Sequence, residues 1–154
     1  MRTPVRDFGG TPAYRVISFF VRGAAKPTQT GSVMRVKQKE GKDRLIPMRR
    51  GTAWSAKCAL AAEEHAPPQP LEGPLEVRLH FYLPKPKSGK ASKRKYPSVK
   101  PDVENLGKGI LDSWNSVLYA DDSQVVSLLQ EKDYVGKGMM VGVDVWIREL
   151  EAVS

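Results

Sequence analysis

The stretch KPDVENLGKGILDSW, residues 100–114, organises the chain because its polar and apolar side chains separate onto two sides of one helix. At about 3.6 residues per turn, the apolar side chains fall on one arc that extends to Val117. Pro101 suits the start of such a helix. The pattern predicts a helix over residues 102–115 that packs one side against a sheet. Its other side carries Asp102, Glu104, Asn105, Lys108 and Asp112.

Strand patterns lie on both sides of this helix. Residues 75–83 alternate between apolar and polar side chains without interruption, which is typical of a half-buried strand. Three further segments are rich in apolar, β-branched or aromatic residues and also indicate strands. Trp54, Cys58 and Ala62 lie on one face of a second predicted helix. We therefore expect strands at 13–21, 75–83, 124–132 and 139–149, a helix at 53–65, and a short strand near 32–36.

These elements predict a small single α+β domain over residues 1–154, with two helices packed on one face of a mixed sheet. The first 12 residues are expected to be flexible. The last two strands are expected to form a hairpin around the turn Gly136-Lys137-Gly138.

The composition favours an anionic partner. The chain of 154 residues has a formal net charge of +8, and a basic balance of this size most often indicates nucleic acid, although a merely basic protein stays open. A single cysteine, Cys58, excludes an internal disulfide and fits a reducing cytosol. No apolar run is long enough for a membrane span, so we expect a cytoplasmic protein with no membrane partner.

The basic residues gather in one loop. Residues 84–100 contain seven lysines and arginines and no acid, with Gly, Ser and Pro throughout, which predicts a loop rather than a core element. This loop leads directly into the acidic helix. The residues expected to contact a phosphate backbone are Lys93, Arg94, Lys95 and Lys100, and Tyr96 is a candidate for base stacking.

The acidic side chains also gather, since Asp121 and Asp122 follow the helix at the entrance to a strand. Each acid alone fits a structural interpretation, because acids favour a helix N-terminus and Glu104 can pair with Lys108. Together, carboxylates beside a basic surface repel phosphate unless they hold a cation. Mg²⁺ prefers such oxygen donors and can activate water against a phosphodiester. The sequence therefore indicates metal-dependent phosphodiester hydrolysis.

The stretch KPDVENLGKGILDSWNSVLYADDSQVVSLLQEK resembles the signature of the RusA family of Holliday-junction resolvases of bacteria, prophages and phages. That signature has an Asp-x-Asp-Asn-x-x-x-Lys helix start, an Asp further along, and an Asp-Asp-Ser/Ala-Gln block. The positions are filled in order by Asp102, Glu104, Asn105, Lys108, Asp112, Asp121, Asp122, Ser123 and Gln124. Glu104 departs from the usual Asp; it keeps the charge but adds a methylene.

The resemblance implies a homodimeric α+β endonuclease that needs Mg²⁺ or Mn²⁺ and resolves four-way DNA junctions by symmetric paired nicks, in recombination and repair. It implies metal-binding roles for Asp102, Glu104 and Asp122, and a catalytic role for Lys108. Asp112 and Asp121 would be supporting acids. It also implies a bacterial cell, with the gene carried by the host, a prophage or a phage.

Two alternatives stay open at this stage. A non-catalytic basic DNA-binding protein would use the same loop, with the acidic helix serving a protein partner. A nuclease for flaps or forks would keep the chemistry and change the substrate. Both the resolvase and the binding protein predict salt-sensitive DNA binding, so only metal-dependent cleavage separates these two.

Overall fold

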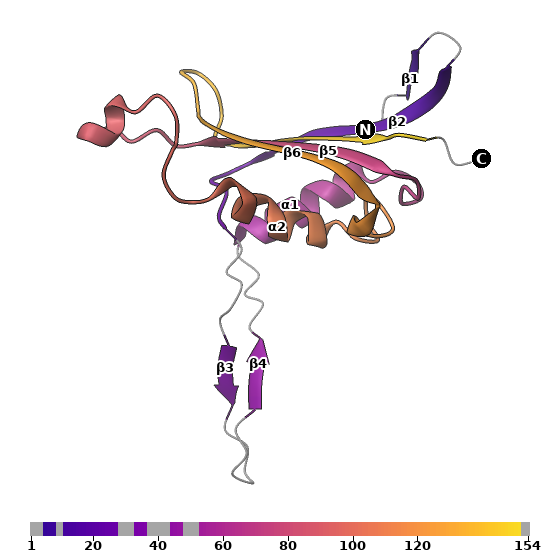
Figure 1. The fold of residues 1–154 in the computed structure, drawn as a ribbon, viewed down its shortest axis with the longest axis horizontal. Coiled ribbons are helices and arrows are strands. Elements are labelled where there is room, and N and C mark those ends of the chain that lie inside the picture. The colour runs from indigo at the N-terminus through magenta and orange to yellow at the C-terminus, as the bar shows by residue number, and fades with distance from the viewer. Residues whose placement is uncertain (1–4, 9–10, 28–32, 37–43, 48–52, 152–154) are drawn as a thin grey trace.

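A computed structural model describes residues 5–8, 11–27, 33–36, 44–47 and 53–151. Five strands form one mixed sheet in the order β1-β2-β7-β5-β6. The helices α1 (Ala53–His65) and α2 (Val103–Ser113) both lie on one face of this sheet, and the other face carries no helix of the described chain (Figure 1). The strands of this sheet are β1 (Val5–Phe8), β2 (Thr11–Arg22), β5 (Leu75–Leu83), β6 (Val125–Tyr134) and β7 (Gly142–Glu149). The expected α+β class is confirmed.

The smaller elements lie in the connections. Strands β3 (Val33–Val36) and β4 (Arg44–Pro47) pair with each other as a separate two-stranded sheet, at the place where one short strand was expected. Two 3₁₀ helices, η1 (Lys90–Lys93) and η2 (Asp122–Gln124), lie in the basic loop and directly before β6. The N-terminal stretch expected to be flexible contains β1, which pairs antiparallel with β2.

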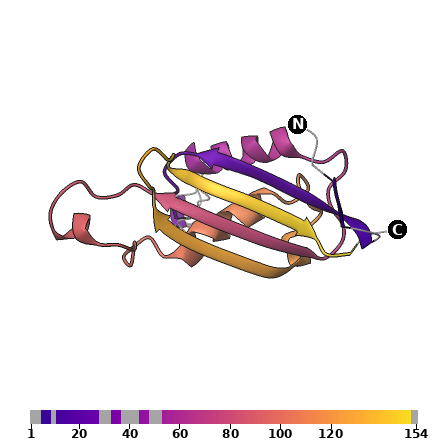
Figure 2. The ribbon, with the colours of Figure 1, turned by 90° about the horizontal axis from the view of Figure 1, so that it is seen from above.

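The predicted hairpin between the last two strands is wrong. Among the described strands, β6 pairs only with β5, in parallel, whereas β7 lies between β5 and β2 and runs antiparallel to both. Parallel neighbours need a long crossover connection, and residues 84–124 supply it by carrying the chain along the basic loop and back through α2. Figure 2 shows the outcome, with β6 at one edge of the sheet and β5 between it and β7.

The core lies between the sheet and the two helices. Strand β5 places Leu75, Val77, Leu79 and Phe81 inward, all fully buried, as its alternation predicts. Trp114, at the end of α2, is fully buried and its indole Nε1 donates to the carbonyl oxygen of Cys58 at 3.1 Å. This bond links the two helices. Burial raises the pKa of the Cys58 thiol to about 12.

Helix α2 is shorter than its sequence pattern suggests. Asp102 is its N-cap residue in an extended conformation, and the helix ends at Ser113. Ser116 has a φ of 64°, in the left-handed region, so the chain turns there and Val117 is not part of the helical face. Trp146 is half-buried on the open face of the sheet, between Arg78 and Arg148. No described helix is long and apolar enough to cross a membrane.

Candidate functional site

The N-terminal end of α2 presents two of the predicted acids. Asp102 and Glu104 are both exposed, at the cap and in the first turn. Asp102 and Asn105 border an open hollow that is completed by Ala25, Pro27, Lys100 and Pro101. This end of the helix therefore offers carboxylate oxygens next to a lysine of the basic loop.

Strand β6 holds this end of α2 in place from a distance in sequence. The ammonium group of Lys132 donates to the carbonyl oxygens of Val99 and Pro101, each at 2.8 Å. Pro101 directly precedes Asp102, and Val99 lies three residues before it. Lys132 carries no signal in the sequence, since the contact joins residues about 30 positions apart, and only the parallel placement of β6 brings it there.

The C-terminal end of α2 presents the other predicted acids. The backbone N–H of Asp122 donates to the side-chain oxygen Oδ1 of Asn115 at 2.7 Å, which ties the start of η2 to the turn after α2. The backbone N–H of Asp121 donates to Gln124 Oε1 at 2.7 Å. Gln124 Nε2 in turn donates to the carbonyl oxygens of Leu71 and Gly73, both at 2.9 Å. These amides fix the backbone of the acidic pair.

The charges at this end influence one another. Burial, followed by the nearby Asp121 and Asp112 carboxylates, raises the pKa of Asp122 above its usual value. The hydroxyl of Ser123 donates to Asp121 at 2.5 Å and lowers the pKa of that carboxyl. Burial and the same three carboxylates raise the pKa of Tyr119. Asp112, Asp121 and Asp122 therefore share one electrostatic neighbourhood.

The structure does not bring all the predicted metal-binding acids together. Asp102 and Asp112 lie at opposite ends of α2, about 15 Å apart at roughly 1.5 Å per residue. Lys108 is exposed between them, one helical turn from both Glu104 and Asp112. Over the described ranges, no group of three or more His, Cys, Asp and Glu side chains could hold a metal ion. The donor chemistry suits Mg²⁺, but one copy of the described chain does not gather Asp102, Glu104 and Asp122.

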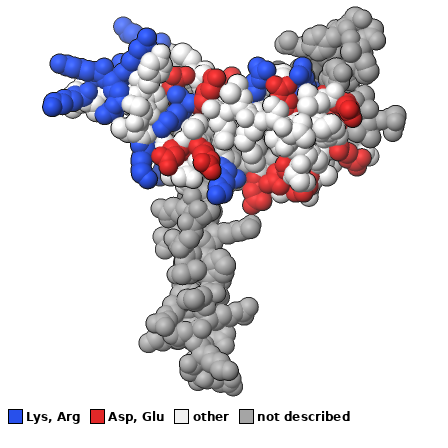
Figure 3. All heavy atoms as spheres, in the orientation of Figure 1, with Lys and Arg blue, Asp and Glu red and all other residues white. Residues whose placement is uncertain are grey.

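The basic loop projects from the end of the sheet beside the N-terminus of α2. In Figure 3 its lysines and arginines form a blue cluster next to red carboxylates. Lys93, Lys95 and Lys100 are exposed, and the ammonium group of Lys95 lies 5.4 Å from the ring centre of Tyr96. Arg94 is partly buried and donates to the hydroxyl of Tyr134 at 3.3 Å. The three lysines are thus better placed for an extended anion than Arg94 is.

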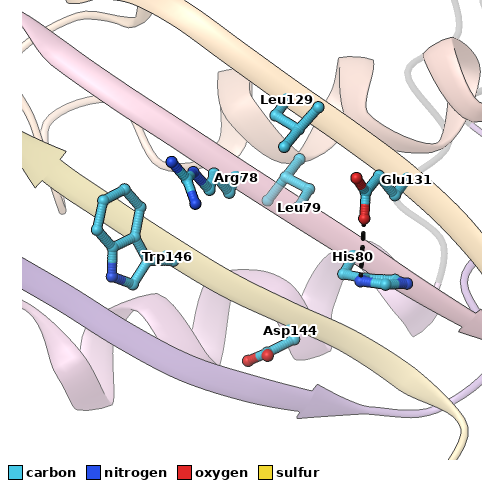
Figure 4. A pocket seen from close by; sticks show the side chains of 7 residues that line it. All are labelled: Arg78, Leu79, His80, Leu129, Glu131, Asp144 and Trp146. Atoms are coloured by element: carbon cyan, nitrogen blue, oxygen red, sulfur yellow. Dashed lines mark ion pairs between the residues drawn. The ribbon is translucent and has the colours of Figure 1, made fainter.

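A shallow hollow of about 470 Å³ lies on the opposite face of the sheet (Figure 4). His80 lies within it, between Glu131 at 3.4 Å and Asp133 at 2.7 Å. The neighbouring strand adds Asp144 and Trp146 to its lining. Because the helices cover the other face of the sheet, this hollow is separate from the acidic groups at the two ends of α2.

Comparison with known proteins supports the resemblance in the sequence. The chain is 40% identical over 103 residues to the uncharacterized protein YqaN of Bacillus subtilis (strain 168), which covers 61% of this chain and 70% of the relative. Residues 25–147 match the family model described as endodeoxyribonuclease RusA. This match includes β5, the basic loop, both ends of α2 and β6. The chain therefore belongs to the RusA family of endodeoxyribonucleases.

Proposed function

We propose that this protein is an Mg²⁺-dependent endonuclease, with Mn²⁺ as an alternative, that resolves Holliday junctions by symmetric paired nicks. The observation that carries the proposal is the family's acid and lysine signature, which lies at exposed and partly exposed positions along α2 and in η2, beside a basic loop. Such a function belongs to DNA recombination and repair in the cytoplasm of a bacterial cell. Two opposed nicks need two active sites, which a homodimer provides.

The residues divide by role. Asp102, Glu104 and Asp122 would hold the metal, which when bound would supply a nucleophilic water and neutralise charge at phosphorus. Lys108 would steady the attacked phosphate from the exposed side of α2. Asp112 and Asp121 would support the site through their charge, since both already raise the pKa of Asp122. Asn115 and Gln124 would orient the acidic pair through the backbone bonds described above.

The first experiment compares substrates. The protein is incubated with an end-labelled four-way junction and with a linear duplex of the same sequence, each with Mg²⁺ and with EDTA. We expect paired nicks on the junction alone and only with Mg²⁺. Tight junction binding without cleavage under Mg²⁺ or Mn²⁺ would instead support a DNA-binding protein. Preferred cleavage of flaps or forks would indicate the same metal-dependent hydrolysis on a different branched DNA substrate.

The lysines of the basic loop should determine the salt dependence of binding. Replacing Lys93, Lys95 and Lys100 together by glutamine should reduce the slope of log affinity against log salt by up to about 2.7, since each phosphate contact contributes about 0.9. The slope is measured by fluorescence anisotropy on a labelled junction. Lys137→Gln, an exposed lysine outside the loop, is the control. An unchanged slope in the triple variant would place the DNA elsewhere.

Lys132 should act as a positioning residue. Lys132→Met keeps a long side chain but loses both bonds to the carbonyls before Asp102. We expect single-turnover cleavage to slow roughly tenfold, because a misplaced acid lowers the fraction of productive geometry. Junction affinity should hold, and Lys132→Arg, which keeps donors there, should recover part of the rate. An equal loss of affinity in Lys132→Met would instead make Lys132 a DNA contact.

A further inference from the structure

The open face of the sheet carries acids that the proposed nuclease site does not use. Strand β5 sets His80 between Glu131 on β6 and Asp144 on β7, because His80 is the register partner of both acids. Figure 4 shows these two acids on opposite sides of the imidazole ring. Asp133, two residues further along β6, lies 2.7 Å from the Nε2 atom of the same ring. These three open-face acids locally reverse the charge of a chain whose formal net charge is +8.

The open-face acids are not equally engaged. Among the described residues, Glu131 and Asp133 each contact the His80 ring, whereas Asp144 forms no ion pair. The ring of Tyr82 stacks on His80, with ring centres 4.4 Å apart. Burial, followed by the three carboxylates, raises the pKa of the Tyr82 hydroxyl, so the field over this part of the face is negative. Asp144 is therefore the carboxylate that can pair with an incoming cation.

Two hollows with large apolar side chains lie on either side of Asp144 along β7. Toward Trp146, Asp144 borders the hollow of about 470 Å³, which Leu129 also lines. In the other direction Asp144 borders a second hollow, of about 330 Å³. Aromatic and thioether side chains line this second hollow, namely Phe20, Tyr82, Met139 and Met140. The open face thus presents one carboxylate between two places for apolar groups.

An extended peptide fits this arrangement. Alternate side chains of an extended chain lie on one face about 6.6 Å apart, at roughly 3.3 Å per residue. Trp146 and Asp144 are alternate residues of β7, and Gly142 is the next. Gly142 pairs with Tyr82, which lines the second hollow. A peptide that lies along β7 can therefore place one side chain in each hollow and the side chain between them on Asp144. Beside Trp146, Arg78 lies 4.9 Å from the ring centre, so a cationic side chain is favoured at Asp144 and not at that end.

Other ligands fit this face less well. The open-face acids repel the phosphates of a nucleic acid, and α2 with its predicted nuclease residues lies on the opposite face of the sheet (Figure 1). Over the described ranges, no group of three or more His, Cys, Asp and Glu side chains could hold a metal ion. A basic segment of another protein is attracted by these acids and repelled by the positive charge of the rest of the chain. Its charge therefore directs it to this face.

We propose that the open face is a docking site for an extended segment of a partner protein, in which a lysine or arginine lies between two large apolar residues at alternate positions. The basic side chain pairs with Asp144, and the apolar side chains occupy the two hollows. An exposed ion pair contributes little affinity, so the apolar contacts supply most of the binding and the charge selects the partner. This docking does not depend on the proposed nuclease function and leaves α2 accessible to DNA.

A synthetic peptide tests the docking site. The probe is a short fluorescein-labelled peptide with an arginine between two leucines at alternate positions and serine elsewhere, and a second peptide has glutamate in place of the arginine. Fluorescence anisotropy should show that the wild type prefers the arginine peptide by about tenfold, and that Asp144→Lys prefers the glutamate peptide. This reversal would also show that the variant is folded. Glu63→Lys, the same change at an exposed position on α1, should behave as the wild type.

The apolar contacts and the partner class are tested in the same assay. Replacing Met139 and Met140 together by serine should weaken binding of the arginine peptide by about fivefold, because apolar contacts in the second hollow are lost. Leu60→Ser is the control, since Leu60 is an exposed leucine of α1. An unlabelled four-way junction should not displace the peptide.

Four results would overturn the proposal. They are no binding of the arginine peptide, the same preference in Asp144→Lys as in the wild type, an unchanged affinity in the methionine variant, and displacement by DNA. The last of these would make the face a nucleic-acid surface instead. The assay needs no cleavage, so a protein that binds the peptide but cuts no junction would refute the proposed function and leave the docking site intact.

Discussion

Asp122→Asn is expected to reduce junction cleavage by roughly a hundredfold or more, since it removes a metal-binding charge from a site that depends on carboxylates. Binding to the junction should be kept or tightened, because the same change removes a negative charge that faces phosphate. The backbone N–H of residue 122 still donates to Asn115, so the local fold should be preserved. Single-turnover cleavage and fluorescence anisotropy, measured on the same junction, check the two expectations.

The control for this variant is Asp144→Asn. Asp144 is exposed on the open face of the sheet, away from α2, so the same chemical change there should leave cleavage at the wild-type rate. Cleavage by Asp122→Asn at the wild-type rate would remove that acid from the site. Loss of both cleavage and binding would indicate damage to the turn between α2 and β6.

Local patterns predicted most of the elements. Helix α1 and strand β5 have the bounds that their periodicity indicates, because each buries one regular face against the same core. The order of the strands was harder to predict, since the sequence Gly136-Lys137-Gly138 is a plausible hairpin turn. The choice between pairing β7 with β6 and placing it beyond β5 depends on how the crossover through α2 packs. That packing joins residues far apart in the chain.

The sequence names the candidate residues of the site, but it does not predict how they are arranged. A helical wheel treats Asp102 as helical, whereas it caps the helix, and the wheel gives no position for Asp122 after the turn. The helix runs back along β6, which is why Asp112 and Asp122 lie near each other and Asp102 does not. The roles of Lys132 and Asn115 could not be predicted from the sequence, because this antiparallel course determines which residues they contact. Side-chain type thus indicated the chemistry, and only the topology separated the acids into two groups.

Trp114→Ala is expected to lower the free energy of unfolding by about 4 kcal/mol, because it removes a fully buried indole and leaves a cavity between the helices. It also deletes the bond from Nε1 to the Cys58 carbonyl and the edge contact with Phe19, whose ring centre lies 5.6 Å away. The neighbouring Asn115 holds Asp122, so the loss should also disturb the acidic pair. Urea unfolding followed by circular dichroism gives the free energy.

Trp146→Ala tests whether the loss of stability in Trp114→Ala is due to the burial of the ring or merely to the removal of a tryptophan. Trp146 is half-buried on the open face and contacts Arg78 and Arg148 rather than the core, so its removal should cost only about 1 kcal/mol. A similar loss in both variants would contradict the placement of the core between the sheet and the two helices. A small loss in Trp114→Ala alone would mean that the end of α2 is not anchored by this ring. The position of Asp122 would then need another support, which makes the comparison a test of the site as well as of the fold.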